Sequence, residues 1–146
     1  MSIISAIQSY IKNCTELEYG APVWINYLGN EPIEYSIVPI PGSRVVETYL
    51  DGSSLRVYPF AFQSVESTAD DLERLEAQGF YEAFADWLEE QSELGELPEL
   101  GSGRISEKME AVNWGYLFQS GESATGIYQI QCQLQYMQYK NESDSS

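Results

Sequence analysis

The sequence predicts a single α+β domain: an antiparallel β-sheet of about five strands with two α-helices packed on one face, in the order αβββαββ. Apolar residues recur at helical spacing over 3–14 and over 68–91, whereas β-branched and aromatic residues crowd the segments 33–62 and 105–140. A chain of 146 residues suits one domain with a modest core. We expect this domain to span residues 1–140 and to be followed by a flexible acidic tail over 141–146.

The first helix is expected over 3–14, with Ser2 placed to cap its first turn. The connector that follows contains two glycines and two prolines, which favour loop structure. Large apolar side chains in a loop are expected to fold back onto the core. Those of this connector are Trp24, Ile25, Tyr27 and Leu28.

The first strand is expected over 33–40, and Pro39 and Pro41 place it at an edge of the sheet or end it there. A β-hairpin is expected next, over 44–62, with its turn at Asp51-Gly52. Its second strand is apolar on both faces, which is typical of a central strand covered on both sides. Pro59 cannot donate a ladder hydrogen bond, so we expect a local bulge there.

The second helix is expected to begin at Thr68, with Asp71 completing a capping-box-like start. Gly79 weakens its middle and indicates a bend or close packing. The predicted buried stripe consists of Leu72, Leu75, Phe80, Phe84, Trp87 and Leu88.

Two strands close the predicted domain, the first over 105–121 and the second over 125–140. In the first, Val112, Trp114, Tyr116 and Phe118 are expected to share one face. The second reads "YQIQCQLQYMQYK", so glutamines alternate with Ile, Cys, Leu and Tyr. One face of this strand is therefore apolar and the other consists of neutral amides. Amides make many polar contacts without charge, which suits a surface that lies against another protein.

Composition excludes several classes of chemistry. The chain has no histidine, which removes Ser-His-Asp and Cys-His catalysis and imidazole metal ligation. Cys14 and Cys132 are interpreted as reduced, buried thiols, because two cysteines alone do not make a metal site. The glycine-rich segments lack the lysine of a P-loop. We therefore expect no catalytic, cofactor-binding or metal-binding residues.

Neither a membrane span nor a signal peptide is expected. No apolar run approaches the roughly 20 residues that cross a bilayer. The N-terminal stretch lacks a basic segment and a small-residue cleavage site. The sequence therefore predicts a protein that stays in the cytoplasm where it is made.

The charge is strongly negative, at −16 from 23 acids and seven bases. The seven bases are scattered along the chain, which disfavours binding to nucleic-acid phosphates. From Glu66 to Glu99 there are twelve acids and one base, Arg74. This segment is interpreted either as a solvated helix face or as a surface for electrostatic docking or exclusion.

Several blocks of sequence, taken in order, resemble a known family. They are "GSRVVETYLDGSSLRVYPFAF", "GFYEAFADWLEEQ", "LPEL", "GR" with "KMEA", "GYLF" and "YQIQCQLQY". Together they resemble the minor capsid or tail terminator (tail-completion) proteins of long-tailed phages and prophages of Gram-positive bacteria. The resemblance covers roughly residues 40–140, and it depends on the order of the blocks because no single block is diagnostic.

The resemblance implies a subunit of a ring, hexameric in such proteins, that sits on the tail tube, stops its polymerisation and docks the head connector. The implied partners are other copies of the chain, the tail tube protein, the head–tail connector or adaptor proteins, and the sheath protein if the tail is contractile. DNA would pass through the lumen without specific binding. The implied location is the head–tail junction of the virion, after assembly in the host cytoplasm.

A ring needs two different complementary patches on each subunit. Arg44 and Arg56, which flank the predicted turn, are candidates to meet acids of a neighbour. The residues predicted for the subunit or tube interface are Arg44, Arg56, Glu89, Glu90, Glu93, Gln129, Gln131, Gln133 and Gln135. Three alternatives remain open at this point: another neck or connector role, an acidic mimic of DNA that inhibits a nucleic-acid enzyme, and an enzyme that uses carboxylates alone.

Overall fold

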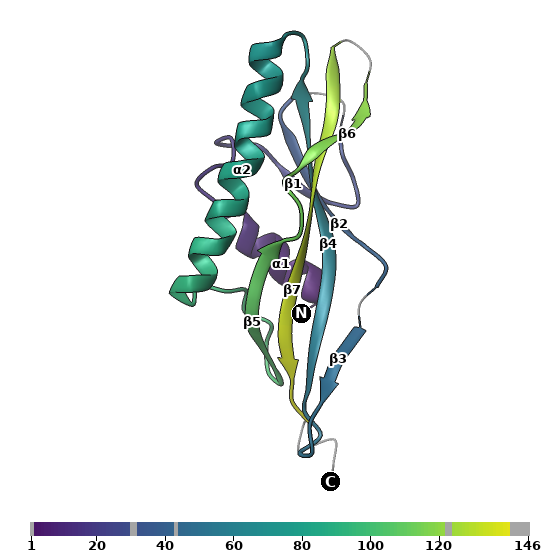
Figure 1. Ribbon diagram of the computed structural model, residues 1–146, viewed down its shortest axis with the longest axis vertical. Helices are drawn as coiled ribbons and strands as arrows, with labels where there is room; N and C mark the ends of the chain where they lie inside the picture. Colours follow the sequence, from purple (N-terminus) through teal and green to yellow (C-terminus); the bar gives the residue numbers. More distant parts are fainter. Residues whose placement is uncertain (1, 30–31, 43, 122–123, 141–146) are drawn as a thin grey trace.

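The structure is a computed structural model that describes residues 2–29, 32–42, 44–121 and 124–140, so the predicted tail at 141–146 lies outside the described residues. Two helices and seven strands are found in this part of the chain (Figure 1). In order they are α1 (Ile3–Ile11), β1 (Val23–Ile25), β2 (Glu34–Pro39), β3 (Arg44–Thr48), β4 (Ser54–Ser67), α2 (Asp71–Leu94), β5 (Arg104–Ala111), β6 (Tyr116–Ser120) and β7 (Thr125–Gln138).

The strands form one sheet in the order β1-β2-β4-β7-β5, with β3 also paired to β4 and β6 also paired to β7. Within the described ranges β1·β2 is the one parallel pair. The predicted α+β class with a mostly antiparallel sheet is therefore confirmed. The expected number of about five strands is wrong for two reasons. The connector supplies β1, and the segment 105–120 divides into β5 and β6 around Gly115, whose φ is 82°.

The long strands β4 and β7 form the centre of the sheet and pair along their full length, from Ser54↔Gln138 to Ser67↔Thr125. The bulge predicted at Pro59 is absent from this described pairing. Pro59 accepts a hydrogen bond from the Ile40 N–H at 3.1 Å, so its backbone polar groups face away from β7. On that side β2 ends at Pro39 and β3 starts at Arg44, so the missing N–H of Pro59 falls between two partner strands.

Strand β2 ends at Pro39, which is one of the two outcomes that its prolines predicted. It is not an edge strand, because β1 lies on its outer side. Val23 of β1 is buried and Ile25 packs against the core. The prediction that Trp24 and Tyr27 fold back onto the core is wrong: both are exposed, and their rings contact each other at 5.7 Å. The alternation of a strand explains the difference, since Trp24 points to the opposite face from Val23 and Ile25.

Each helix begins with a residue whose side chain caps its first turn. The predicted cap of α1 is correct, whereas the predicted cap of α2 is wrong. The Ser2 side chain accepts a hydrogen bond from the Ser5 N–H at 3.2 Å, as predicted. The cap of α2 is Asp70 instead of Thr68: its carboxylate accepts from the Glu73 N–H at 2.9 Å. The Thr68 N–H donates to the carbonyl of Ala124 at 2.8 Å, which ties this residue to the neighbouring loop instead.

The buried stripe of α2 is rotated from the predicted one. Ala77, Tyr81, Phe84 and Leu88 are the buried residues, spaced four, three and four apart. Extending that spacing toward the start of the helix does not reach the predicted Leu72 and Leu75, which are 65% and 69% exposed. Phe80 and Trp87 flank the stripe and are partly buried. Gly79 is not a point of close packing, because no described atom lies within 4 Å of where its Cβ would be.

One hydrophobic core lies between the helices and the sheet, and the Phe62 ring is near its centre. The Phe62 ring centroid lies 5.3 Å from that of Tyr35 and 4.5 Å from that of Phe84, both in stacked orientation. Helix α1 adds Ile7 and Ile11, which are fully buried. Figure 1 shows that β3 and the adjoining ends of β4 and β7 continue past the helices. This uncovered β3–β4 hairpin turns at Asp51-Gly52, as predicted.

Candidate functional site

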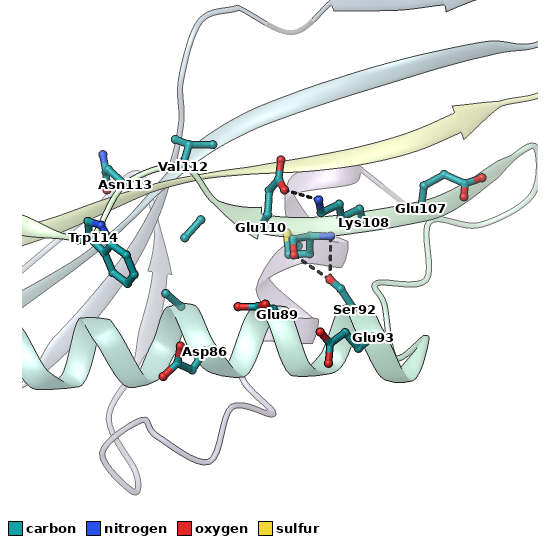
Figure 2. Close-up of a pocket in the computed structure, with 13 residues that line it drawn as sticks. Asp86, Glu89, Ser92, Glu93, Glu107, Lys108, Glu110, Val112, Asn113 and Trp114 are labelled. Carbon is teal, nitrogen blue, oxygen red and sulfur yellow. Dashed lines mark hydrogen bonds and ion pairs between the residues drawn. The ribbon is translucent and has the colours of Figure 1, made fainter.

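A surface groove runs between α2 and the strand β5, with a volume of about 670 Å³ (Figure 2). One wall is the C-terminal half of α2, and the other is β5 together with the loop that leads to β6. Trp114, which is 70% exposed, lies at one end of the groove. The charged residues that line the groove are Asp86, Glu89, Glu93, Glu107, Lys108 and Glu110. Figure 2 shows the charged ends of Lys108 and Glu110 pointing away from α2, so the negative charge of the groove comes mainly from the acids of α2.

The one base of the groove is held by an ion pair on β5. The Lys108 ammonium lies 2.8 Å from Glu110, whose other carboxylate oxygen accepts a hydrogen bond from Gln133 at 2.8 Å. Partial burial alone would raise the pKa of Glu110, but the hydrogen bonds from Lys108 and Gln133 outweigh it and lower that pKa. The hydrogen bond to Glu110 in turn raises the pKa of Lys108. Glu110 therefore stays ionised. The acids that α2 contributes to the groove, Asp86, Glu89 and Glu93, form no ion pair with a described base.

The hydroxyl of Ser92 on α2 connects the helix to the edge of β5 at the floor of the groove. It donates to the carbonyl of Met109 at 2.8 Å and accepts from the Met109 N–H at 3.1 Å. Both outward-facing backbone groups of Met109 are thus satisfied by one side chain. This contact fixes the distance between the two walls and occupies the Ser92 hydroxyl.

The thiols and carboxylates of the described residues do not assemble a site with evident reactivity. Burial raises the pKa of Cys14 to about 11 and raises that of Cys132 further. Both are free thiols inside the protein, as the sequence predicted. No cluster of three or more Cys, Asp or Glu side chains suited to a metal ion is found in the described ranges. Across the same ranges, no helix is both long and apolar enough to span a bilayer.

The amide face of β7 is real, but most of its side chains are engaged within the chain. Gln129 is buried; it accepts a hydrogen bond from Gln63 at 2.7 Å and donates to the Tyr116 hydroxyl at 2.8 Å. Gln131 accepts from Asn113 at 3.3 Å, and Gln133 donates to Glu110. Gln135 lies on the same face and pairs with Val57 and Lys108 across the strands. These contacts leave fewer amide groups for a partner than the alternation suggests.

The other predicted interface residues fall at separate places. Arg44 pairs with Val57 and Arg56 pairs with Val45, so the two arginines point to opposite faces of the β3–β4 hairpin. Glu89 and Glu93 lie on the groove, as Figure 2 shows. Glu90 is exposed on α2 but does not line the groove. The structure thus groups two of the three predicted acids and separates the third.

Sequence reasoning missed the β5 wall of the groove, namely Glu107, Lys108, Glu110 and the exposed Val112 and Trp114. Val112, Trp114, Tyr116 and Phe118 were expected on one face of a single strand, but β5 ends at Ala111 and all four are exposed. The available signal was Asn113 and Gly115 on either side of Trp114, since both residue types favour turns.

A second, smaller hollow of about 340 Å³ lies on the other side of α2. It is lined by Glu16, Glu18, Glu66, Glu73 and Glu76 without a basic residue. Glu66 is the buried one of these. Burial raises the pKa of Glu66, and the charge of Glu18 adds to this effect. The ionised form of Glu66 is therefore less favourable in the folded protein than in the unfolded chain.

We expect Glu66→Gln to raise the melting temperature at neutral pH. The pKa of Glu66 is higher in the folded state, so its ionisation removes stability as pH rises above the ordinary value of 4.5. A neutral amide avoids that loss, and the gain should shrink as the pH falls toward 4.5. Thermal unfolding followed by circular dichroism across this range measures the effect. Glu90→Gln, on the exposed face of α2, is the matched control, and an equal pH-dependent gain there would contradict the explanation.

Comparison with known proteins adds no identification: no protein-family model matches the chain, and no curated protein matches it significantly.

Proposed function

We propose that this chain is a structural protein of a long-tailed phage, a tail terminator that forms a homo-oligomeric ring, hexameric as in the proteins it resembles. The ring caps the tail tube, stops its polymerisation and docks the head connector. Its partners are then other copies of the chain, the tube protein and the connector or adaptor proteins. DNA passes through its lumen during ejection.

The observation that carries the proposal is the uneven distribution of charge over the chain. Helix α2 has eight acids and one base. At the far end of the sheet the four bases Arg44, Arg56, Arg104 and Lys140 lie among the three acids Glu47, Asp51 and Glu107, so this end is close to neutral. A head-to-tail contact between copies requires two unlike surfaces on one chain, and these two surfaces differ in charge.

The overall charge supports the same role. At −16, free subunits repel one another, and a ring of such subunits carries a negative field. Phosphate groups of DNA would pass a negative lumen without binding to it. The exposed hairpin and the acidic groove lie on the same elements that carry the resemblance, from "GSRVVETYLDG" to "KMEA".

Deleting the gene in the phage or prophage that encodes it, followed by electron microscopy of the lysate, tests the role. We expect filled heads beside unjoined tails of abnormal length, with normal virions restored when the gene is supplied in trans. Tails of normal length without heads would contradict the terminator role and favour an adaptor. Intact virions would contradict any essential role in the neck.

A further inference from the structure

We infer that the face of the sheet opposite the helices docks against the same face of a second copy of this chain, as a two-fold dimer. Both helices pack on one face of the sheet, where Phe60 and Phe62 of β4 join residues of α1 and α2 in the core. The other face, here called the outer face, carries the alternate residues of each strand. The inference concerns the free chain and does not depend on the proposed ring.

The outer face is nearly free of charge, although the chain has a net charge of −16. The neighbouring strands turn only Glu34, Arg44, Glu47, Lys108 and Glu110 toward it, so its formal charge is −1, from three acids and two bases. A second copy can therefore approach this face without meeting the acids that dominate elsewhere. The central strands contribute only uncharged residues, namely Leu55, Val57, Pro59, Ala61, Gln63, Val65, Ser67, Thr125, Ile127, Gln129, Gln131, Gln133, Gln135 and Met137.

A contact through the outer faces also keeps the acidic helices of the two copies apart. Helix α2 has eight acids and packs on the opposite face of its own sheet. Two sheets that pack face to face lie about 10 Å apart, and each helix lies on the far side of its sheet. The two helices are therefore separated by more than the screening length of about 8 Å at physiological salt. This orientation limits the repulsion between two negatively charged copies.

Apolar side chains lie beneath and beside the amides of the outer face. Val57, Ala61 and Val65 are buried although they lie outside the core between the helices and the sheet. Trp24 is exposed at the border formed by β1, and Tyr116 is exposed at the border formed by β6. Exposed aromatic residues are enriched at protein interfaces. The outer face thus combines apolar area with neutral polar groups.

Two amides at the middle of β7 are complementary to each other across a two-fold axis. The carbonyl oxygen of Gln131 accepts a hydrogen bond from Asn113 at 3.3 Å, and the amide nitrogen of Gln133 donates to Glu110 at 2.8 Å. Within the described residues, the amide nitrogen of Gln131 and the carbonyl oxygen of Gln133 have no hydrogen bond. In a two-fold contact, Gln131 of each copy can donate to Gln133 of the other.

The orientation of both amides follows from their partners. The side-chain oxygen of Asn113 accepts from the backbone N–H groups of Gly115 and Gln131, each at 3.2 Å. Its NH2 group therefore points to the oxygen of the Gln131 amide. The ionised carboxylate of Glu110 can only accept, so Gln133 presents its NH2 group to it. The free donor and the free acceptor are thus fixed by contacts within the chain.

The outer face has the area that a stable dimer needs. Strands β4 and β7 each have 14 residues, which is roughly 46 Å at about 3.3 Å per residue. Because β2 and β3 flank β4, and β5 and β6 flank β7, the sheet is four strands or roughly 19 Å wide over most of this length. Two such faces total about 1,700 Å², which matches the roughly 1,600 Å² of a typical stable interface.

Sedimentation equilibrium of the full-length chain tests the dimer. We expect a monomer–dimer equilibrium, and Gln131→Glu should raise its Kd at least about tenfold, because it replaces the free donor by a charged acceptor at the centre of the contact. The new carboxylate still accepts from Asn113, and circular dichroism checks that the variant is folded. The matched control is Gln91→Glu on α2, which adds the same charge away from the outer face and should leave the Kd unchanged.

The dependence on salt gives a second readout that needs no variant. Added NaCl should leave the Kd unchanged or lower it, because salt screens the repulsion between two chains of −16 and no opposite charges hold the copies together. A dimer that dissociates in salt would show a contact between acids and bases and would overturn the inference. A chain that stays monomeric at every concentration reached, or equal effects of Gln131→Glu and Gln91→Glu, would overturn it as well.

The outcome is separable from that of the proposed function. A dimer with these properties, together with intact virions after gene deletion, would support the contact and contradict the terminator role. A monomeric free chain, together with unjoined tails of abnormal length after gene deletion, would do the opposite.

Discussion

Replacing Phe62 by alanine should lower the free energy of unfolding by about 3–5 kcal/mol, the range observed for buried aromatic residues. Phe62 is fully buried on β4, with its ring stacked on Tyr35 and Phe84. It joins the central strand to α2, and its removal leaves a cavity that stacked rings cannot close by small shifts. Urea unfolding followed by tryptophan fluorescence measures the loss.

The matched control is Phe118→Ala on β6, which removes the same group from a half-exposed site. It should cost less than about 1 kcal/mol, as surface substitutions usually do. A loss at Phe118 as large as that at Phe62 would show that β6 packs against something other than the described core. A loss of under about 1 kcal/mol at Phe62 would contradict its central place in the core.

Gly115→Ala should lower the free energy of unfolding by about 2–5 kcal/mol, for two reasons that add. Gly115 has a φ of 82°, a conformation that costs an L-residue about 1–2 kcal/mol. A Cβ there would also lie 2.7 Å from the Cβ of Tyr81, and such overlap costs about 1–3 kcal/mol. Tyr81 cannot move aside easily: it is fully buried and hydrogen-bonded to Ser64 at 2.6 Å and to the Tyr128 carbonyl at 3.1 Å.

Gly101→Ala separates the two costs. Gly101 has a similar φ of 88°, but no described atom lies within 4 Å of its Cβ position. It should therefore show only the backbone cost, about 1–2 kcal/mol. Denaturant unfolding of both variants gives the overlap cost as their difference. If the two losses are equal, Tyr81 tolerates the added methyl group and the junction between β5 and β6 is looser than described.

Residues that are neighbours along the chain were sufficient to predict several features of the structure. The Ser2 cap, the turn at Asp51-Gly52 and the two-sided pattern of β7 were all predicted, and each depends on residues that are neighbours along the chain. The exclusion of histidine-dependent chemistry likewise follows from composition alone. Among the candidate interface residues, Glu89 and Glu93 lie together on the groove, and their place in a subunit interface stays a prediction.

The tertiary structure decided what depends on contacts between distant segments. Leucines and aromatics of α2 offer more than one apolar stripe, and only packing against Phe62 and Tyr128 selects the line through Tyr81 and Phe84. The glutamines of β7 are identical in the sequence, yet their partners come from β4, β5 and β6 and differ in each case. At the floor of the groove Ser92 connects α2 to Met109, a contact across 17 residues that periodicity cannot reveal. Sequence patterns thus determined most of the elements and the two faces of β7, whereas long-range packing determined the buried face of α2, the contacts between faces and the position of the charged groove.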